Sequence, residues 1–135
     1  MLVVDASVAI LWFLPQARSE AARALLGAGE ELVGPRLLGL EVGSALLRAT
    51  RRGEMAAATA RRSTLDLLPD MVRSTDREGL LGEALDLALQ HRGSLSDAVY
   101  VALARGLGVP LVTDDAQMRG VALRAGAAAR LLEDG

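Results

Sequence analysis

Short apolar, β-rich runs alternate along the chain with longer Ala- and Leu-rich segments, and this alternation limits the fold more than any other feature. Five short runs predict strands: residues 1–4, 31–34, 71–73 (the weakest), 109–113 and 128–132. Strands that alternate with helices form a parallel sheet whose two faces are covered by helices. The sequence therefore predicts an α/β fold with a central parallel sheet of four to five strands.

The longer segments carry apolar residues at helical spacing. They are residues 7–14, 17–28, 36–52, 54–67, 76–90, 94–107 and 115–125. Proline and glycine mark several of their ends. Pro69 is expected to stop the fourth segment, and Gly108 follows the sixth, where a left-handed cap is expected.

The length of 135 residues suits one domain spanning residues 1–135. The longest apolar run opens the chain and is interrupted by Asp5 and Ser7, so nothing reaches the roughly 20 residues that a membrane span needs. No basic segment precedes that run, which argues against a secretory signal. Because the chain also has no cysteine, we expect a cytoplasmic protein without disulfides and without a membrane partner.

Missing residue types exclude several chemistries. All fifteen basic residues are arginine, and the only histidine is His91. A Walker phosphate loop and Schiff-base catalysis both need a lysine, and thiol catalysis needs a cysteine. One histidine cannot build a multi-histidine zinc site, and no nucleophile elbow accompanies it. Carboxylates, hydroxyls and arginines remain as the groups that can carry chemistry.

Two acids stand where a structural role and a functional role both remain open. Asp5 follows the first predicted strand, where an aspartate commonly caps the next helix. Glu41 lies inside the 36–52 helix, and its neighbours one turn away are apolar or small, with no arginine among them. A buried glutamate needs a partner. Glu41 therefore either faces a cation or lies at the solvent boundary.

Three further acids lie at predicted helix starts. Asp97 is three residues after Ser94, a spacing that resembles a capping box, and the helix dipole favours an acid in the first turn. Asp114 and Asp115 follow the strand that ends at Thr113. One of these two is expected to cap the next helix, so the other is surplus to capping.

Each acid has a structural explanation alone, but together they suggest a common site. In open parallel sheets, functional groups meet beyond the carboxyl ends of the strands. Clustered carboxylates repel one another, and divalent cations relieve that repulsion. Oxygen-only ligands select Mg²⁺ or Mn²⁺, which can activate water and stabilise charge on a phosphoryl group.

Four segments in this order resemble one known family: Val3–Val8, Pro35–Arg48, Leu95–Ala104 and Pro110–Asp115. The sequence resembles PIN-domain nucleases, and within them the VapC-type toxins of prokaryotic toxin–antitoxin pairs. Each motif alone is weak, but the four in register cover essentially the whole chain. The resemblance implies a three-layer PIN-like fold.

The resemblance also assigns residues. Asp5, Glu41, Asp97 and Asp115 match the four catalytic acids of the family, and the three aspartates among them match its metal ligands. Two hydroxyl residues match positions that support the acids or water, and Asp114 is an extra carboxylate at a variable position. These two hydroxyl residues are Ser7 and Thr113.

The implied activity is that of an endoribonuclease that depends on Mg²⁺ or Mn²⁺ and serves as the toxin of a type II pair. Implied partners are RNA, a cognate antitoxin that enters the acidic cleft, and a second copy in a homodimer. Arg48 is the first candidate for gripping the RNA backbone, and Arg18 and Arg119 are weaker ones. With four acids assigned to the metal site, the other charges sum to +2, so the net charge of −2 does not argue against RNA.

Alternatives stay open within and outside this family. A housekeeping PIN nuclease that processes RNA would carry the same acids. A PIN-like module that binds RNA or a partner without cleaving would lack or misplace one of them. A phosphatase of the haloacid dehalogenase type is disfavoured, because Ser7 stands where its second aspartate would be and no lysine exists.

Overall fold

The computed structural model describes residues 1–132 and contains the predicted parallel sheet, with five strands. All neighbouring strands are parallel, in the order β3-β2-β1-β4-β5. The strands are β1 (Leu2–Val4), β2 (Leu32–Gly34), β3 (Arg73–Ser74), β4 (Leu111–Thr113) and β5 (Ala129–Leu131). In the central register, Val3 is paired with Val33 on one side and with Leu111 on the other.

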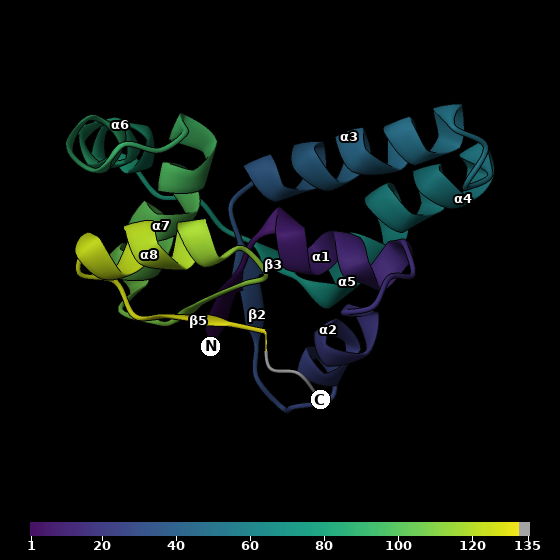
Figure 1. Cartoon of the computed structure of the whole chain (residues 1–135), viewed down its shortest axis with the longest axis horizontal. Coiled ribbons are helices and arrows are strands. Elements are labelled where there is room, and N and C mark those ends of the chain that lie inside the picture. The colour runs from purple at the N-terminus through teal and green to yellow at the C-terminus, as the bar shows by residue number, and fades with distance from the viewer. Residues whose placement is uncertain (133–135) are drawn as a thin grey trace.

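Helices cover both faces of the sheet, as the sequence predicts. They are α1 (Ala6–Phe13), α2 (Ser19–Leu26), α3 (Leu37–Arg51), α4 (Ala57–Arg62), α5 (Leu68–Met71), α6 (Leu80–His91), α7 (Leu95–Leu107) and α8 (Ala116–Arg124). Figure 1 shows α1 to α5 grouped on one side of the strands and α6 to α8 on the other, which gives three layers. None of the helices that the structure describes is long and apolar enough to cross a membrane.

Apolar strands form the centre of the core because both sheet faces are covered. Val3, Val33 and Leu111 are fully buried. Trp12, at the end of α1, is also buried, and its Nε1 donates a hydrogen bond of 2.8 Å to the carbonyl oxygen of Ala22 in α2. The single tryptophan therefore fixes the first two helices to each other.

The expectation that Pro69 stops the 54–67 helix is wrong. After α4, residues Ser63–Leu67 form a π-helical turn, and α5 continues through Pro69 to Met71. Pro69 lies in the first turn of α5, where a missing N–H costs little, and the wider turn before it replaces the regular hydrogen-bond ladder. The third strand consequently begins at Arg73, two residues later than predicted.

The strand order places a topological switch point between β1 and β4. The chain leaves β1 toward β2 and leaves β4 toward β5, so the connections after these two neighbouring strands run in opposite directions. Ligand sites in open α/β sheets lie at such a switch point, beyond the carboxyl ends of the strands. Asp5 directly follows β1 and Asp114 directly follows β4, so the fold brings the two ends of the chain's acidic pattern together.

Candidate active site

Asp5 is the most buried of the four candidate catalytic acids, with 3% of its surface exposed. Its Oδ1 accepts hydrogen bonds from the Ser7 hydroxyl at 2.6 Å and from the backbone N–H of Val8 at 3.3 Å. Its Oδ2 accepts a hydrogen bond from the Thr113 hydroxyl at 2.5 Å. Asp5 therefore caps α1, as the structural interpretation expected, and is at the same time held rigidly where β1 meets β4.

The two predicted supporting hydroxyls join the ends of these strands. The Ser7 and Thr113 hydroxyl oxygens lie 3.2 Å apart. Ser7 Oγ accepts a hydrogen bond of 2.9 Å from the backbone N–H of Asp114, and Thr113 Oγ1 accepts one of 3.1 Å from that of Asp115. Both hydroxyls thus fix the backbone after β4 as well as the carboxylate after β1.

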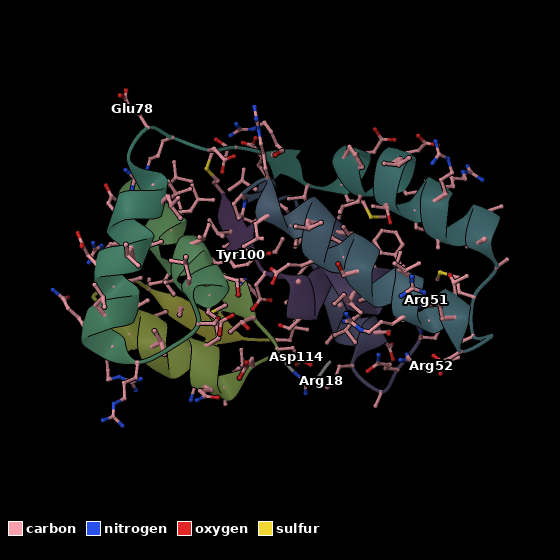
Figure 2. The ribbon with its side chains drawn as sticks, turned by 90° about the horizontal axis from the view of Figure 1, so that it is seen from above. Arg18, Arg51, Arg52, Glu78, Tyr100 and Asp114 are labelled. Atoms are coloured by element: carbon pink, nitrogen blue, oxygen red, sulfur yellow. The ribbon has the colours of Figure 1, made fainter. Side chains whose placement is uncertain are left out.

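Glu41 has a partner that the sequence did not identify. The Tyr100 hydroxyl donates a hydrogen bond of 2.5 Å to Glu41 Oε1. Tyr100 is 1% exposed, and Glu41 is half-buried on α3. Burial, with the hydrogen bond to Glu41 second, raises the pKa of Tyr100 far above its usual range, so the hydroxyl remains a donor. In Figure 2, Tyr100 lies at the centre of the molecule, between the two groups of helices.

Asp97 is both a first-turn residue and a member of the acidic group. Its backbone N–H donates a hydrogen bond of 3.0 Å to Ser94 Oγ at the start of α7. Partial burial, followed by repulsion from Asp115, raises the pKa of Asp97. Burial also raises the pKa of Asp5 to about 6 against the hydrogen bonds that it accepts, and Asp97 adds to that rise. Mutual repulsion therefore links Asp5 to Asp97 and Asp97 to Asp115.

Asp114 and Asp115 have different surroundings. Asp115 is exposed and caps α8, because its Oδ1 accepts hydrogen bonds from the N–H groups of Gln117 at 2.9 Å and Met118 at 3.4 Å. Asp114 Oδ1 instead lies 3.3 Å from Nε of Arg18, and Figure 2 shows this pair side by side. Arg18 neutralises Asp114, while Asp115 acts electrostatically on Asp97.

The three arginine candidates for RNA contact lie in different environments. Arg18 is half-buried and forms an ion pair with Asp114. It also donates a hydrogen bond to the backbone oxygen of Leu132. Arg48 is exposed on α3, seven residues and therefore about two turns beyond Glu41. Arg119 is exposed on α8.

The donor set has the chemistry of a hard cation site. Within residues 1–132, no arginine forms an ion pair with Asp5, Glu41, Asp97 or Asp115. Oxygen-only carboxylates without an internal counter-charge suit Mg²⁺ or Mn²⁺. As the side chains of this described part stand, however, no three of its acidic or histidine residues are close enough to hold one ion. As described, the three aspartates are therefore not arranged as joint ligands of one ion.

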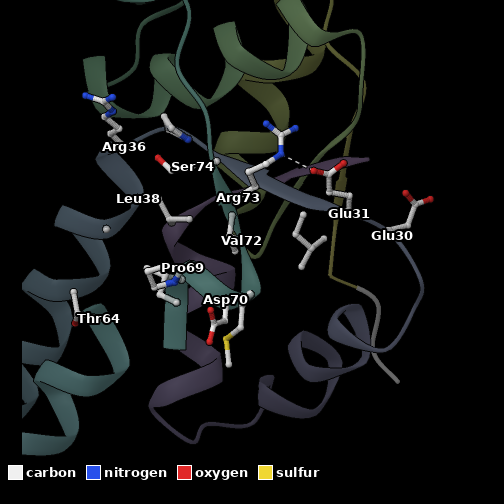
Figure 3. Close-up of a pocket in the computed structure, with 16 residues that line it drawn as sticks. Glu30, Glu31, Arg36, Leu38, Thr64, Pro69, Asp70, Val72, Arg73 and Ser74 are labelled. Carbon is white, nitrogen blue, oxygen red and sulfur yellow. Dashed lines mark hydrogen bonds and ion pairs between the residues drawn. The ribbon is translucent and has the colours of Figure 1, made fainter. Parts of the chain in front are cut away.

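A separate pocket of about 520 Å³ lies along β2 and β3, away from the four acids. Figure 3 shows the ion pair between Glu31 and Arg73 at its rim. Leu38 and Val72 contribute apolar surface to it. The pocket contains none of the four candidate catalytic residues, so its size does not identify it as the reaction site.

Comparison with known proteins relates the chain to one family. The PIN domain family model matches residues 2–123. Ribonuclease VapC3 of Pyrobaculum aerophilum is 34% identical over 120 residues, covering 87% of this chain and 91% of that relative.

Solved structures are similar over most of the chain. The crystal structure of PAE2754 from Pyrobaculum aerophilum has a TM-score of 0.71 and 25% identity, and the match covers 95% of this chain and 89% of that one. A toxin–antitoxin complex from Klebsiella pneumoniae has a TM-score of 0.66 at 14% identity, with coverage of 88% and 90%, which shows a shared fold.

Proposed function

Because the chain belongs to the PIN domain family, we propose that it is an endoribonuclease of the VapC toxin type that depends on Mg²⁺ or Mn²⁺. One observation supports the proposal: repulsion links Asp5 to Asp97 and Asp97 to Asp115 near the ends of β1 and β4, Tyr100 connects Glu41 to this group, and no arginine of the described part of the chain pairs with any of the four. Asp5, Asp97 and Asp115 are the metal ligands, and Glu41 completes the catalytic set. We also propose that residues 1–135 form a single PIN domain.

The chain's own residues prepare the site for water attack on an RNA phosphodiester. Ser7 and Thr113 each donate to one oxygen of Asp5, which keeps this carboxylate in one orientation. Tyr100 occupies Glu41 Oε1, so Oε2 is the atom that accepts the proton of the attacking water. A bound ion supplies charge neutralisation on the phosphoryl group and lowers the pKa of water. The attack is in line with the leaving oxygen.

A cognate antitoxin is the proposed protein partner. The similar structure from Klebsiella pneumoniae is a toxin–antitoxin complex, which supports this assignment. An arginine of the antitoxin can bind these carboxylates, because bidentate guanidinium–carboxylate pairs are strong charge-assisted contacts. Because its proposed substrate is cellular RNA, the proposed location of the protein is the cytoplasm.

We assign a second copy of the chain to the outer face of α6. Three leucines form a stripe there, one helical turn apart: Leu81 is 64% exposed, Leu85 49% and Leu89 77%. The opposite face of α6 packs into the core through Leu80 and Leu87. Contiguous exposed apolar surface of this kind supports a homodimer interface.

Cleavage of labelled RNA by the purified protein tests the proposed activity. RNA should be cut when Mg²⁺ or Mn²⁺ is added, and cutting should stop in excess EDTA and in Asp5→Asn. Asp70→Asn, at an exposed acid on α5, serves as the control and should keep full activity. Cleavage that survives EDTA or Asp5→Asn contradicts the proposal. A stably folded protein that binds RNA without cutting it favours the non-cleaving alternative.

The housekeeping alternative is separated from the toxin role by a different observation. A toxin gene should have a small antitoxin-like reading frame immediately upstream, and co-expression of that product should suppress RNA cleavage. A nuclease without such a neighbour belongs with the RNA-processing PIN enzymes.

A further inference from the structure

One end of the molecule carries a concentration of positive charge. Residues 48–66 run from the last turn of α3 through α4 into the π-helical turn, and we call them the basic arm. They contain five arginines and two acids, a net charge of +3, so the rest of the chain carries −5. The arginines are Arg48, Arg51, Arg52, Arg61 and Arg62. The small net charge of the whole protein therefore conceals two regions of opposite sign.

Most of these arginines are available to a ligand. All five are exposed. Arg52 is ion-paired with Glu54, through contacts of 2.9 and 3.1 Å. The other four make no ion pair within residues 1–132. Four guanidinium groups thus face solvent, each able to make bidentate contacts with a phosphate.

The arm is continuous with the candidate active site through α3. Glu41 and Arg48 are seven residues apart on this helix, so they lie on nearly the same face. Arg51, at the end of α3, lies about 15 Å along the axis from Glu41. Figure 2 shows Arg51 and Arg52 toward the far end of α3 from Tyr100, which marks the acidic group.

The second helix of the arm folds back against the first. A hollow of about 320 Å³ between α3 and α4 is lined by residues of both helices, including Thr50 and Arg61. Figure 1 shows α3 and α4 projecting together at the end of the molecule opposite α6. Arg61 lies at this hollow, and the other free arginines are exposed elsewhere on the same projecting pair of helices.

Charge screening lets this surface act independently of the acids. The Debye length is about 8 Å at physiological ionic strength, so repulsion from the acidic group is largely screened at about 15 Å. A polyanion that reaches Glu41 and continues along α3 passes Arg48 and then reaches Arg51 at the end of the helix, where α4 begins to fold back.

We propose that the basic arm binds the phosphate backbone of single-stranded RNA on one side of the scissile bond. This inference rests on the proposed nuclease function for the position of that bond, whereas RNA binding by the arm is measurable without cleavage. An acidic protein segment is the competing occupant, but the alignment of Arg48 with Glu41 favours the substrate.

The test compares two triple variants that remove the same charge. The arm variant is Arg51→Gln, Arg61→Gln and Arg62→Gln, and the matched control is Arg23→Gln, Arg124→Gln and Arg130→Gln, also exposed. Binding of a fluorescein-labelled single-stranded RNA of about 20 nucleotides is followed by anisotropy in EDTA, over a series of NaCl concentrations. Circular dichroism checks that both variants are folded.

Loss of three phosphate contacts has a defined signature. Each contact to single-stranded RNA contributes about 0.7 to the slope of log K against log salt, so the arm variant should lose about 2 from that slope. At 0.1 M salt its Kd should rise roughly 100-fold, whereas the control should stay close to the unsubstituted protein. The single variant Arg61→Gln should lose about 0.7 of the slope.

Equal affinities and slopes for the arm and control variants overturn the inference, and that result is expected if the arm binds a protein segment instead. Cleavage by the unsubstituted protein with Mn²⁺ is scored separately. No cleavage together with an arm-dependent slope contradicts the nuclease proposal and supports RNA binding by the arm. If the unsubstituted protein cleaves RNA and the arm variant has the same KM and the same RNA affinity, the nuclease proposal stands and the proposed role of the arm is contradicted.

Discussion

Replacing Asp5 by Asn should stabilise the metal-free protein while it abolishes activity. Asp5 is 3% exposed, and the groups that contact it are two hydroxyls and one backbone N–H. None of these carries a positive charge, and Asp97 adds repulsion. The folded chain therefore holds a carboxylate whose charge is not compensated, and an amide of the same shape removes that charge.

The size of the expected stabilisation follows from the pKa of Asp5. Burial raises this pKa from 3.8 to about 6, so ionising Asp5 costs the folded chain about 3 kcal/mol more than the unfolded chain. The unfolded chain releases this proton near pH 3.8 and the folded chain near pH 6. Between these values the folded chain binds more protons, so stability falls as pH rises through the window.

The Asn side chain does not ionise, so the variant avoids this destabilisation. From this effect alone, its free energy of unfolding should exceed that of the unsubstituted protein by about 1 kcal/mol at pH 4.5 and about 3 kcal/mol at pH 7.5. The amide nitrogen of Asn replaces an accepting oxygen, and the weakened hydrogen bond there lowers the stability of the variant by about 1 kcal/mol at both pH values. We therefore expect nearly equal stabilities at pH 4.5 and a gain of about 2 kcal/mol at pH 7.5, or about 6 °C in Tm.

Urea and thermal unfolding in EDTA at the two pH values measure this difference directly. Added Mg²⁺ should then raise the Tm of the unsubstituted protein at pH 7.5 and leave Asp5→Asn unchanged, because a ligand stabilises only the state that binds it. An Asn variant that is less stable at pH 7.5, or a difference that does not change with pH, refutes the reasoning.

Three other substitutions test separate contacts. Tyr100→Phe should lower kcat roughly 10- to 100-fold with little change in KM, as loss of a group that orients a catalytic residue does; it should add nothing in a Glu41→Gln background, whereas additive losses exclude action through Glu41. Leu85→Asp should convert a dimer into a monomer in light scattering, and an unchanged mass would remove α6 from the interface. Trp12→Phe should cost about 1 kcal/mol or somewhat more in urea unfolding, because the carbonyl of Ala22 loses its donor.

Local patterns in the sequence predict the sheet and its helices well, because the periodicity of apolar residues is a local signal. The failure at Pro69 has a local part, because Pro69 lies in the first turn of α5 after a π-helical turn. A tertiary contact accompanies it: a Cβ on Gly43 of α3 would lie 3.2 Å from Cγ2 of Thr64, so Gly43 allows a close approach of that turn. A pattern of neighbouring residues does not reveal this packing.

In the candidate site, too, local features are predictable from the sequence and contacts between distant residues are not. The caps formed by Asp5 and Asp115 are predictable, since each acid directly precedes its helix. The hydrogen bond from Tyr100 to Glu41 joins residues 59 positions apart. The Arg18 ion pair distinguishes Asp114 from Asp115, and it likewise links distant segments. Contacts of this kind arise only when the fold is complete.

The dependence of the RNA cleavage rate on Mn²⁺ concentration, measured in single turnovers, tests the central claim most directly. The rate of the unsubstituted protein and of Asp70→Asn should rise with Mn²⁺ and saturate. Asp97→Asn should need far more Mn²⁺ or cleave more than about 100-fold more slowly, since loss of a ligand exceeds the loss of an orienting group. Cleavage without Mn²⁺ or Mg²⁺, or a Mn²⁺ dependence that Asp97→Asn leaves unchanged, would contradict a metal-dependent nuclease built on these carboxylates.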